Sequence, residues 1–299
     1  MKITSHEKGI LMVIVSALMF GSYGVWSKLI GDSFGDFYQG WTRGLILTIV
    51  LLPILLYRRE IIPIKREHWK WIFVFLVFTS MTQAPIFYAF NHMDIGTASL
   101  LFFVTMLLTM YVVGFLFLKE KPTSVKVLAF LMAAFGLYLV FSISLISFAL
   151  LAALMAVLNG VASGGEVSFS KKISHAYSPL YLTWLSWIII LISNLPISIL
   201  LGETQHLPSI DVVWLYQLGY SMVSLFGFWL IIAGLKHLEA STGGLLGLLE
   251  IVFSILFGIV IFGESLTGRL IVGGALIIIA AALPHLKEVY DKRKVLRIT

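Results

Sequence analysis

Residues 240–264 read ASTGGLLGLLEIVFSILFGIVIFGE, and residues 95–120 read IGTASLLFFVTMLLTMYVVGFLFLKE. Each stretch is long enough to cross the hydrocarbon core of a bilayer, which takes about 20 mostly apolar residues. Both begin with small residues and both end on a glutamate. One segment of this kind predicts a transmembrane helix, and two that begin and end alike predict a duplicated membrane unit.

The composition of the whole chain is typical of a membrane protein. Of its 299 residues 59% are hydrophobic and 12% are charged, whereas soluble domains average about 45–50% apolar and about 25% charged residues. The absence of cysteine excludes disulfides, thiolate metal sites and a cysteine nucleophile. The net charge of +6 lies mostly in short segments between apolar runs without a basic–aromatic patch, so we expect no nucleic-acid partner.

Ten apolar segments predict an all-α integral membrane protein with ten transmembrane helices in the lipid bilayer. They cover residues 9–29, 36–57, 69–91, 95–118, 124–142, 148–170, 179–201, 212–235, 240–262 and 267–286. The first follows Lys2 and Lys8 and lacks a small-x-small cleavage site, so we interpret it as a retained span rather than a signal peptide.

The basic residues predict the orientation of these spans. Of the 21 lysines and arginines, all except Lys28, Arg43 and Arg269 lie on the same side as the amino terminus. Because short basic loops remain in the cytoplasm, we expect a multi-pass protein of the plasma or inner membrane with both termini cytoplasmic. Residues 287–299 are then a basic cytoplasmic tail.

An internal repeat divides the chain into two units, at residues 9–142 and 148–286. Shifting the sequence by 143 positions aligns residue types that are uncommon in apolar chains: Gly21 with Gly164, Lys28 with Lys171, Tyr38 with Tyr181, Trp41 with Trp184, Pro53 with Pro196 and Trp71 with Trp214. With a drift of one or two positions, Thr97 then meets Thr242 and Glu120 meets Glu264. Because five spans is an odd number, the second unit is inverted, as in many secondary transporters.

The motifs within each repeat resemble those of the drug/metabolite transporter superfamily, specifically its EamA-type permeases. These motifs are the Arg-bearing second helix Gly40-Trp41-Thr42-Arg43, the small-residue starts Ile95-Gly96-Thr97-Ala98-Ser99 and Ala240-Ser241-Thr242-Gly243-Gly244, and the ends Leu118-Lys119-Glu120 and Phe262-Gly263-Glu264. The chain departs from the family pattern where a proline usually interrupts the fourth helix of each repeat, because Leu107 and Ile251 stand there. The resemblance implies ATP-independent transport, commonly export, of amino acids or other small metabolites, with no enzymatic activity and no cofactor.

Two acids within the predicted spans are candidates for proton coupling, because ionisable groups are expensive in a membrane. Glu250 lies about eleven residues, roughly 16 Å, from the nearer end of its helix. This depth places it at the bilayer midplane. Glu166 follows Gly164 and Gly165, and its repeat mate is Tyr23. The alternative interpretation is structural: a protonated Glu250 that fixes helix packing, and a Glu166 that pairs with Lys171 or Lys172.

Five further residues are candidates for a substrate cavity: Arg43, Tyr23, Trp26, Gln83 and Tyr88. Arg43 could bind a substrate carboxylate or Glu250, or it could pair structurally with a helix-end carbonyl or a lipid phosphate. Tyr23 and Trp26 share one face of the first helix. Gln83 and Tyr88 flank Pro85, where Gln83 could instead satisfy a carbonyl released by the proline. Packing against other helices or lipid is the competing interpretation for the aromatic residues, and solvation is the expectation for Lys28 and Lys171.

The sequence therefore predicts a secondary transporter that exports a small amino acid-like or amphipathic, aromatic compound by alternating access, with protons as a possible coupling partner. An uptake permease or exchanger without proton coupling is the leading alternative, followed by a membrane receptor or scaffold. No HExxH, clustered His/Asp or Ser-His-Asp spacing is present, so we expect no metal site. The residues leave monomer and homodimer equally open.

Overall fold

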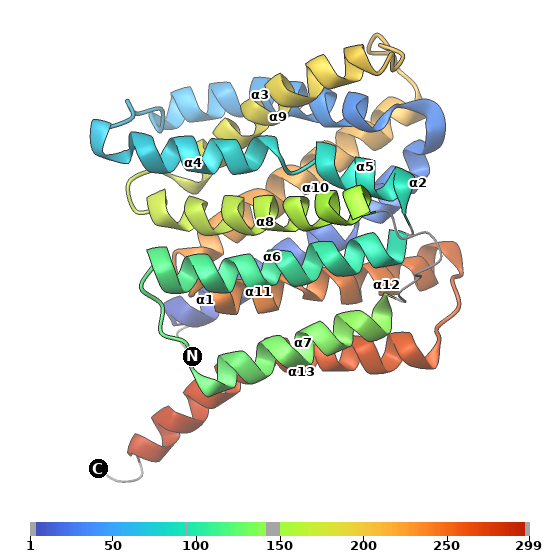
Figure 1. Ribbon diagram of the computed structural model, residues 1–299. Helices are drawn as coiled ribbons and strands as arrows, with labels where there is room; N and C mark the ends of the chain where they lie inside the picture. The colour runs from blue at the N-terminus through green and yellow to red at the C-terminus, as the bar shows by residue number, and fades with distance from the viewer. Residues whose placement is uncertain (1–3, 94, 142–149, 297–299) are drawn as a thin grey trace.

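The computed structural model describes residues 4–93, 95–141 and 150–296, whose regular elements are all helices (Figure 1). Lys2, Asp94, Arg297 and the expected span boundaries at 142 and 148 lie outside this part of the chain. The helices are α1 (Ser5–Gly21), α2 (Tyr23–Ile30), η1 (Gly31–Ser33), α3 (Asp36–Arg58), η2 (Arg66–His68), α4 (Trp69–Ser80), α5 (Ala84–His92), α6 (Ile95–Phe117), α7 (Ser124–Val140), α8 (Leu150–Ile173), α9 (Pro179–Leu200), α10 (Val212–Leu235), α11 (Ala240–Gly247), α12 (Leu249–Phe262) and α13 (Gly268–Leu296).

The helices have the lengths and surfaces of membrane spans. Within the described residues nine helical segments are long and apolar enough to cross a membrane, and α7 is a shorter apolar helix. The expected all-α fold with ten spans is therefore confirmed. Large apolar side chains face outward, such as Leu56 at 59%, Phe73 at 69% and Val260 at 80% exposure. Such a surface is costly in water but matches lipid tails.

Equivalent helices of the two repeats pack against each other. α3 lies beside α9 at one edge of the bundle, and α7 lies beside α13 at the other edge (Figure 1). The two members of each pair run in opposite directions, as an inverted repeat requires. A Cβ atom at Gly136 of α7 would lie 2.9 Å from the carbonyl oxygen of Gly273, so glycine permits this close approach.

Both chain ends lie at the same end of the bundle (Figure 1). We call this the terminal end; it also contains the loops after α3, α6, α8 and α10. Helix α13 continues through the residues expected to form a tail and ends at Leu296. At the start of the chain, Thr4 and Glu7 form a reciprocal capping box that begins α1 before the expected span.

Three spans are interrupted near their middle, where α1 meets α2, α4 meets α5 and α11 meets α12. The interruption between α4 and α5 releases the carbonyl groups of Met81 and Thr82, which accept hydrogen bonds from Asn159 Nδ2 at 3.4 and 2.7 Å. The α11–α12 interruption at Leu248 forms although Ile251 stands where the family usually has a proline. Ile251 N donates to Leu248 O, which makes a tighter turn than that of an α-helix. Its repeat mate α6 is continuous.

Candidate functional site

A cationic cluster lies between α2, α3 and α10. Arg43 of α3 is 4% exposed, and its Cζ lies 3.9 Å from the ring centre of Tyr220 and 5.9 Å from that of Tyr23. Its Nε donates to Gln39 O at 3.1 Å and its Nη1 to Ser224 Oγ at 3.5 Å. The ring of Trp187 completes the surroundings at 6.0 Å.

The Arg43 guanidinium is a buried charge whose surroundings are aromatic and neutral. The ion pairs of the described residues do not include it, and Glu250, which the sequence offered as a partner, is not paired with it. A buried cation is normally compensated by a carboxylate. This cluster therefore suits an anionic group brought by a ligand.

An acidic cluster lies between α4, α8 and α9. Glu166 is 6% exposed, and the hydroxyl-bearing side chains that act on its carboxyl group are Thr79 and Ser186. Glu166 Oε1 and Ser186 Oγ are buried without a hydrogen-bond partner in the described structure. The expected pairing of Glu166 with a lysine is not formed, because Lys171 binds Glu120 Oε1 and Leu238 O, and Lys172 binds Phe117 O.

The two clusters are repeat mates of each other. Arg43 corresponds to Ser186 and Tyr23 to Glu166, both at the offset of 143, and Ser224 corresponds to Thr79 with the drift of two positions. The inverted fold thus builds the same three-sided arrangement twice. The first copy carries a positive charge and aromatic rings, and the second carries a carboxyl group and hydroxyls.

Glu250 lies in the first turn of α12, directly after the α11–α12 interruption. Its side chain is partly exposed, although its backbone packs tightly against α1. A Cβ atom at Gly21 would lie 2.7 Å from Glu250 O, so a larger residue at that position would separate the two helices. Glu250 also acts electrostatically on Tyr23, which places it beside the cationic cluster rather than within it.

The remaining cavity candidates are divided by the structure. Gln83 Oε1 and Asn194 Oδ1 are buried without hydrogen-bond partners in the described residues, and both lie against Gly40. Gln83 does not satisfy the carbonyls released near Pro85, because Asn159 does.

Trp26 packs with Tyr23 against the buried apolar residues that include Tyr220, beside the cationic cluster, whereas Tyr88 belongs to neither cluster. Trp26 packs its ring on Gly219 of α10 and donates from Nε1 to Ser22 Oγ at 3.2 Å. Tyr88 is 36% exposed and stacks on His92 with ring centres 4.1 Å apart. The packing interpretation therefore describes their observed surroundings.

A buried ion pair at the terminal end joins the two repeats. Glu120 Oε1 accepts from Lys171 Nζ at 3.0 Å, and its carboxylate also accepts from Ala240 N and from Ser241 N and Oγ at the start of α11. Burial raises the pKa of Glu120, but the Lys171 ammonium and these hydrogen bonds outweigh burial, so its pKa lies below the ordinary value. Lys171 is therefore not simply solvated, as the sequence suggested.

The repeat mates of this pair meet at the opposite end of the bundle. Lys28 Nζ lies 3.2 Å from Glu264 Oε1, with 55% and 57% of the two side chains exposed. We call Glu120–Lys171 the terminal-end pair and Lys28–Glu264 the opposite-end pair. The alignment of Glu120 with Glu264 was the signal in the sequence that could have predicted both pairs.

Two oppositely directed five-helix units around buried polar clusters define the class of this molecule: a membrane protein with the architecture of secondary transporters. The family model described as the EamA-like transporter family matches residues 7–142 and 150–284, one match in each repeat. The chain belongs to the EamA-like transporter family.

A comparison with solved structures agrees with this assignment at the level of the fold. A crystal structure of a protein with 17% sequence identity superposes with a TM-score of 0.77, over 92% of this chain and 97% of the other. No curated protein matches the sequence. The substrate is therefore inferred from the geometry of the site.

Proposed function

We propose that this protein is a secondary active transporter that exports a small zwitterionic metabolite, amino acid-like and with an apolar or aromatic side chain. The observation that carries this proposal is the pair of repeat-related clusters with opposite chemistry. Arg43 presents a fork of N–H donors that matches a carboxylate, and Glu166 presents an acceptor for an ammonium group. The two clusters adjoin along α9, where Trp187 lies near Arg43 and the neighbouring Ser186 acts on Glu166, so a zwitterion of matching length would satisfy both.

The unpartnered polar atoms around the two clusters support a polar ligand. Glu166 Oε1 and Trp187 Nε1 are buried without partners in the described residues, whereas buried polar groups are nearly always hydrogen-bonded. The rings of Tyr23, Tyr220 and Trp187 around Arg43 suit an apolar or aromatic side chain. Water or substrate would complete these interactions.

The two ion pairs suggest how access alternates. The terminal-end pair links repeat one to the start of α11 in repeat two, and we infer that it holds the terminal end closed. The exposed opposite-end pair is its counterpart under the inverted symmetry. Opening one end of the transporter then corresponds to breaking the ion pair at that end while the pair at the other end persists. If the termini are cytoplasmic, the terminal end faces the cytoplasm.

Counterflow in proteoliposomes tests the transport proposal. Vesicles preloaded with a zwitterionic aromatic amino acid are expected to accumulate the labelled compound well beyond one molecule per protein. The matched amine and the matched carboxylic acid, each lacking one charge, are expected to exchange poorly. Saturation at one molecule per protein would indicate a receptor or scaffold, and equal exchange of all three compounds would contradict recognition by two charged clusters.

An imposed pH gradient tests proton coupling through Glu166 and Glu250. We expect a gradient to drive substrate accumulation in the native protein and not in the Glu166→Gln, Glu250→Gln double variant. Exposed Glu67→Gln at the terminal end is the matched control. Gradient-driven accumulation that survives in the double variant would remove the coupling role, and counterflow without any response to pH would favour an exchanger.

A further inference from the structure

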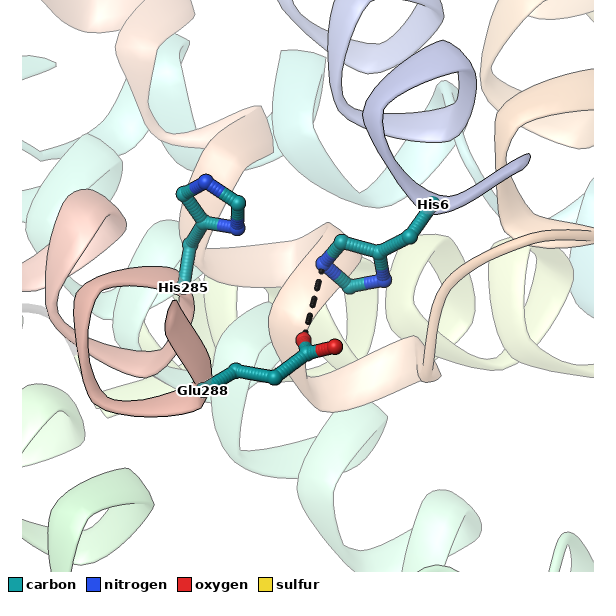
Figure 2. Close-up of side chains that lie close together, drawn as sticks. All are labelled: His6, His285 and Glu288. Carbon is teal, nitrogen blue, oxygen red and sulfur yellow. Dashed lines mark ion pairs between the residues drawn. The ribbon is translucent and has the colours of Figure 1, made fainter. Parts of the chain in front are cut away.

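Three potential metal ligands meet at the terminal end, where the first and last helices of the chain touch. His6 lies in the first turn of α1, and His285 and Glu288 lie on α13 (Figure 2). One donor atom from each side chain lies within 4.8 Å of the other two. His6 Nε2 is 3.1 Å from Glu288 Oε2, and the two imidazole ring centres are 5.5 Å apart.

The spacing of these donors is close to that of a bound metal. Metal–ligand bonds of about 2.0–2.2 Å in a tetrahedral site place neighbouring donors about 3.4 Å apart. The His6–Glu288 separation of 3.1 Å is about 0.3 Å below this value, and the donor atom of His285 lies within 4.8 Å of the other two. His285 and Glu288 are three residues apart on one helix, so they project from the same face.

One imidazole nitrogen of the cluster has no protein partner, and another faces only the carboxylate. His285 Nδ1 is buried and has no hydrogen-bond partner in the described residues, and His6 Nε2 lies 3.1 Å from Glu288 Oε2. Figure 2 shows a ring nitrogen of His285 turned toward His6, whose Nε2 is directed at Glu288. Imidazole nitrogens buried in this way usually bind a donor, an acceptor or a metal.

The surroundings leave room for water to complete the coordination. All three side chains line a cavity of about 600 Å³, whose wall also includes Lys126, Glu239 and His237. Two nitrogens and one carboxylate oxygen favour zinc, nickel or cobalt over magnesium or calcium, which prefer oxygen ligands alone. An open fourth position filled by water is common for zinc bound by three protein ligands.

We propose that His6, His285 and Glu288 form a binding site for a divalent transition metal of the zinc type. Because α1 belongs to the first repeat and α13 to the second, the bound metal would fasten the two repeats together at the terminal end. The proposal stands on these three side chains and does not depend on the transported substrate. Sequence spacing could not predict it, because His6 and His285 lie at opposite ends of the chain.

Cobalt and zinc titrations of the full-length protein test this site. The protein is purified in detergent without a polyhistidine tag and freed of metal with a chelator. We expect one Co²⁺ per chain with the visible absorption of a four- or five-coordinate site, displacement of Co²⁺ by Zn²⁺, and a higher thermal unfolding midpoint with either metal. Size-exclusion chromatography establishes that each variant remains folded.

The variants His6→Ala, His285→Ala and Glu288→Gln are each expected to weaken metal binding by at least about tenfold, the loss typical even of outer-shell partners. Exposed His92→Ala, on α5 far from the terminal end, is the matched control and should bind as the native protein does. Two results would contradict the metal site: no stoichiometric metal binding by the native protein, or unchanged metal binding by His6→Ala. Either result would show that the cluster is an ion pair between His6 and Glu288, with His285 stacked on His6.

Discussion

At the scale of single residues, Arg43 offers the sharpest test of substrate recognition. Replacing it by glutamine removes a charge-assisted interaction, of the kind that contributes about 1.5–3 kcal/mol. We expect Arg43→Gln to raise the KM for counterflow by about 10- to 100-fold, since 1.4 kcal/mol corresponds to tenfold. Arg43→Lys keeps the charge but loses the planar fork over Tyr220, so it should recover only part of the affinity.

The matched control for this experiment is Arg66→Gln, an exposed arginine at the terminal end. Its transport should equal that of the native protein. If Arg43→Gln transported a zwitterion with an unchanged KM, the guanidinium would be a structural group held by Tyr220 and Gln39, and the carboxylate-binding role would be wrong.

Glu166 and Glu250 have different surroundings, so their single variants should differ. Glu166 belongs to the acidic cluster with Thr79 and Ser186, and Glu166→Gln should impair the zwitterion more than the matched carboxylic acid. Glu250 lies outside both clusters in the first turn of α12. Glu250→Gln should spare recognition and reduce the response to a pH gradient, and a loss of zwitterion selectivity in Glu250→Gln would contradict this division.

At the scale of helices, the contact between α1 and α12 depends on a missing side chain. A Cβ atom at Gly21 would lie 2.7 Å from both Glu250 O and Phe253 Cβ, so Gly21→Ala forces the helices apart at a cost of about 1–3 kcal/mol. One turn away, a Cβ atom at Gly24 meets nothing closer than 4.0 Å. Thermal unfolding should show Gly21→Ala clearly destabilised and Gly24→Ala nearly unchanged; equal midpoints would exclude a tight contact.

The terminal-end pair predicts a change in accessibility. Glu120→Gln leaves Lys171 without its carboxylate, and breaking a buried pair in this way costs about 3–5 kcal/mol. Because the native chain has no cysteine, a single Leu245→Cys substitution on buried α11 reports opening through thiol labelling. Labelling should be faster in Glu120→Gln than in the control Glu67→Gln, and identical rates would show that the pair does not close this end.

The pKa of Glu120 fixes the pH range in which this pair acts. Since its folded pKa lies below the ordinary value, the stabilisation is present above that value, about 4.3 for glutamate, and is lost as pH falls through the lower folded pKa. Because only the thiolate reacts, the rate is divided at each pH by that of a small model thiol. The normalised labelling of Leu245→Cys should then stay constant from neutral pH down to about pH 5. A change in this ratio near neutrality would assign the pH response to this pair instead of to Glu166 and Glu250.

The helices show where prediction from sequence succeeds and where it fails. The existence of each span follows from the length of its apolar run, and the repeat follows from aligned rare residues such as Trp71 and Trp214. Both signals survive an error of several residues in where a helix is placed. The direction in which a side chain points cannot be predicted with an error of that size. The α4–α5 interruption ends at Gln83, the N-cap of α5, whereas Tyr88 lies within α5 and stacks on His92. Asn159, a neutral amide in an apolar span, gave no signal that it caps this interruption.

At the scale of the whole molecule, the repeat predicts that both termini lie on one side of the membrane. Ten spans bring the chain back to its starting side, and the structure brings His6 of α1 within 3.1 Å of Glu288 of α13. Reporter fusions at either terminus should both be active in the cytoplasm, because the basic loops lie at that end. Fusions active on opposite sides would contradict the inverted repeat.

The cationic and acidic clusters were only half visible in the sequence. Arg43 and Glu166 stand out because charged groups are rare at these depths, and Tyr23 is marked as the repeat mate of Glu166, whereas Tyr220, Ser224 and Thr79 resemble ordinary span residues. Their roles emerge only when the second repeat is superposed on the first. Pairing of Glu120 with Lys171 depends on the loop after α6 meeting α8 and the start of α11, and the repeat alignment of Glu120 with Glu264 was its one signal in the sequence.

The unequal exposure of the two ion pairs makes the molecule sensitive to the ionic strength of one compartment. In about 1 M salt the screening length falls to about 3 Å, comparable with the 3.2 Å between Lys28 Nζ and Glu264 Oε1, whose half-exposed side chains dissolved ions reach freely. They scarcely reach Glu120, which is 7% exposed beside Lys171. Concentrated salt on the side of the membrane that the opposite end faces would thus weaken one ion pair and leave the other intact, so the salinity of one compartment would itself shift the balance between the two ends.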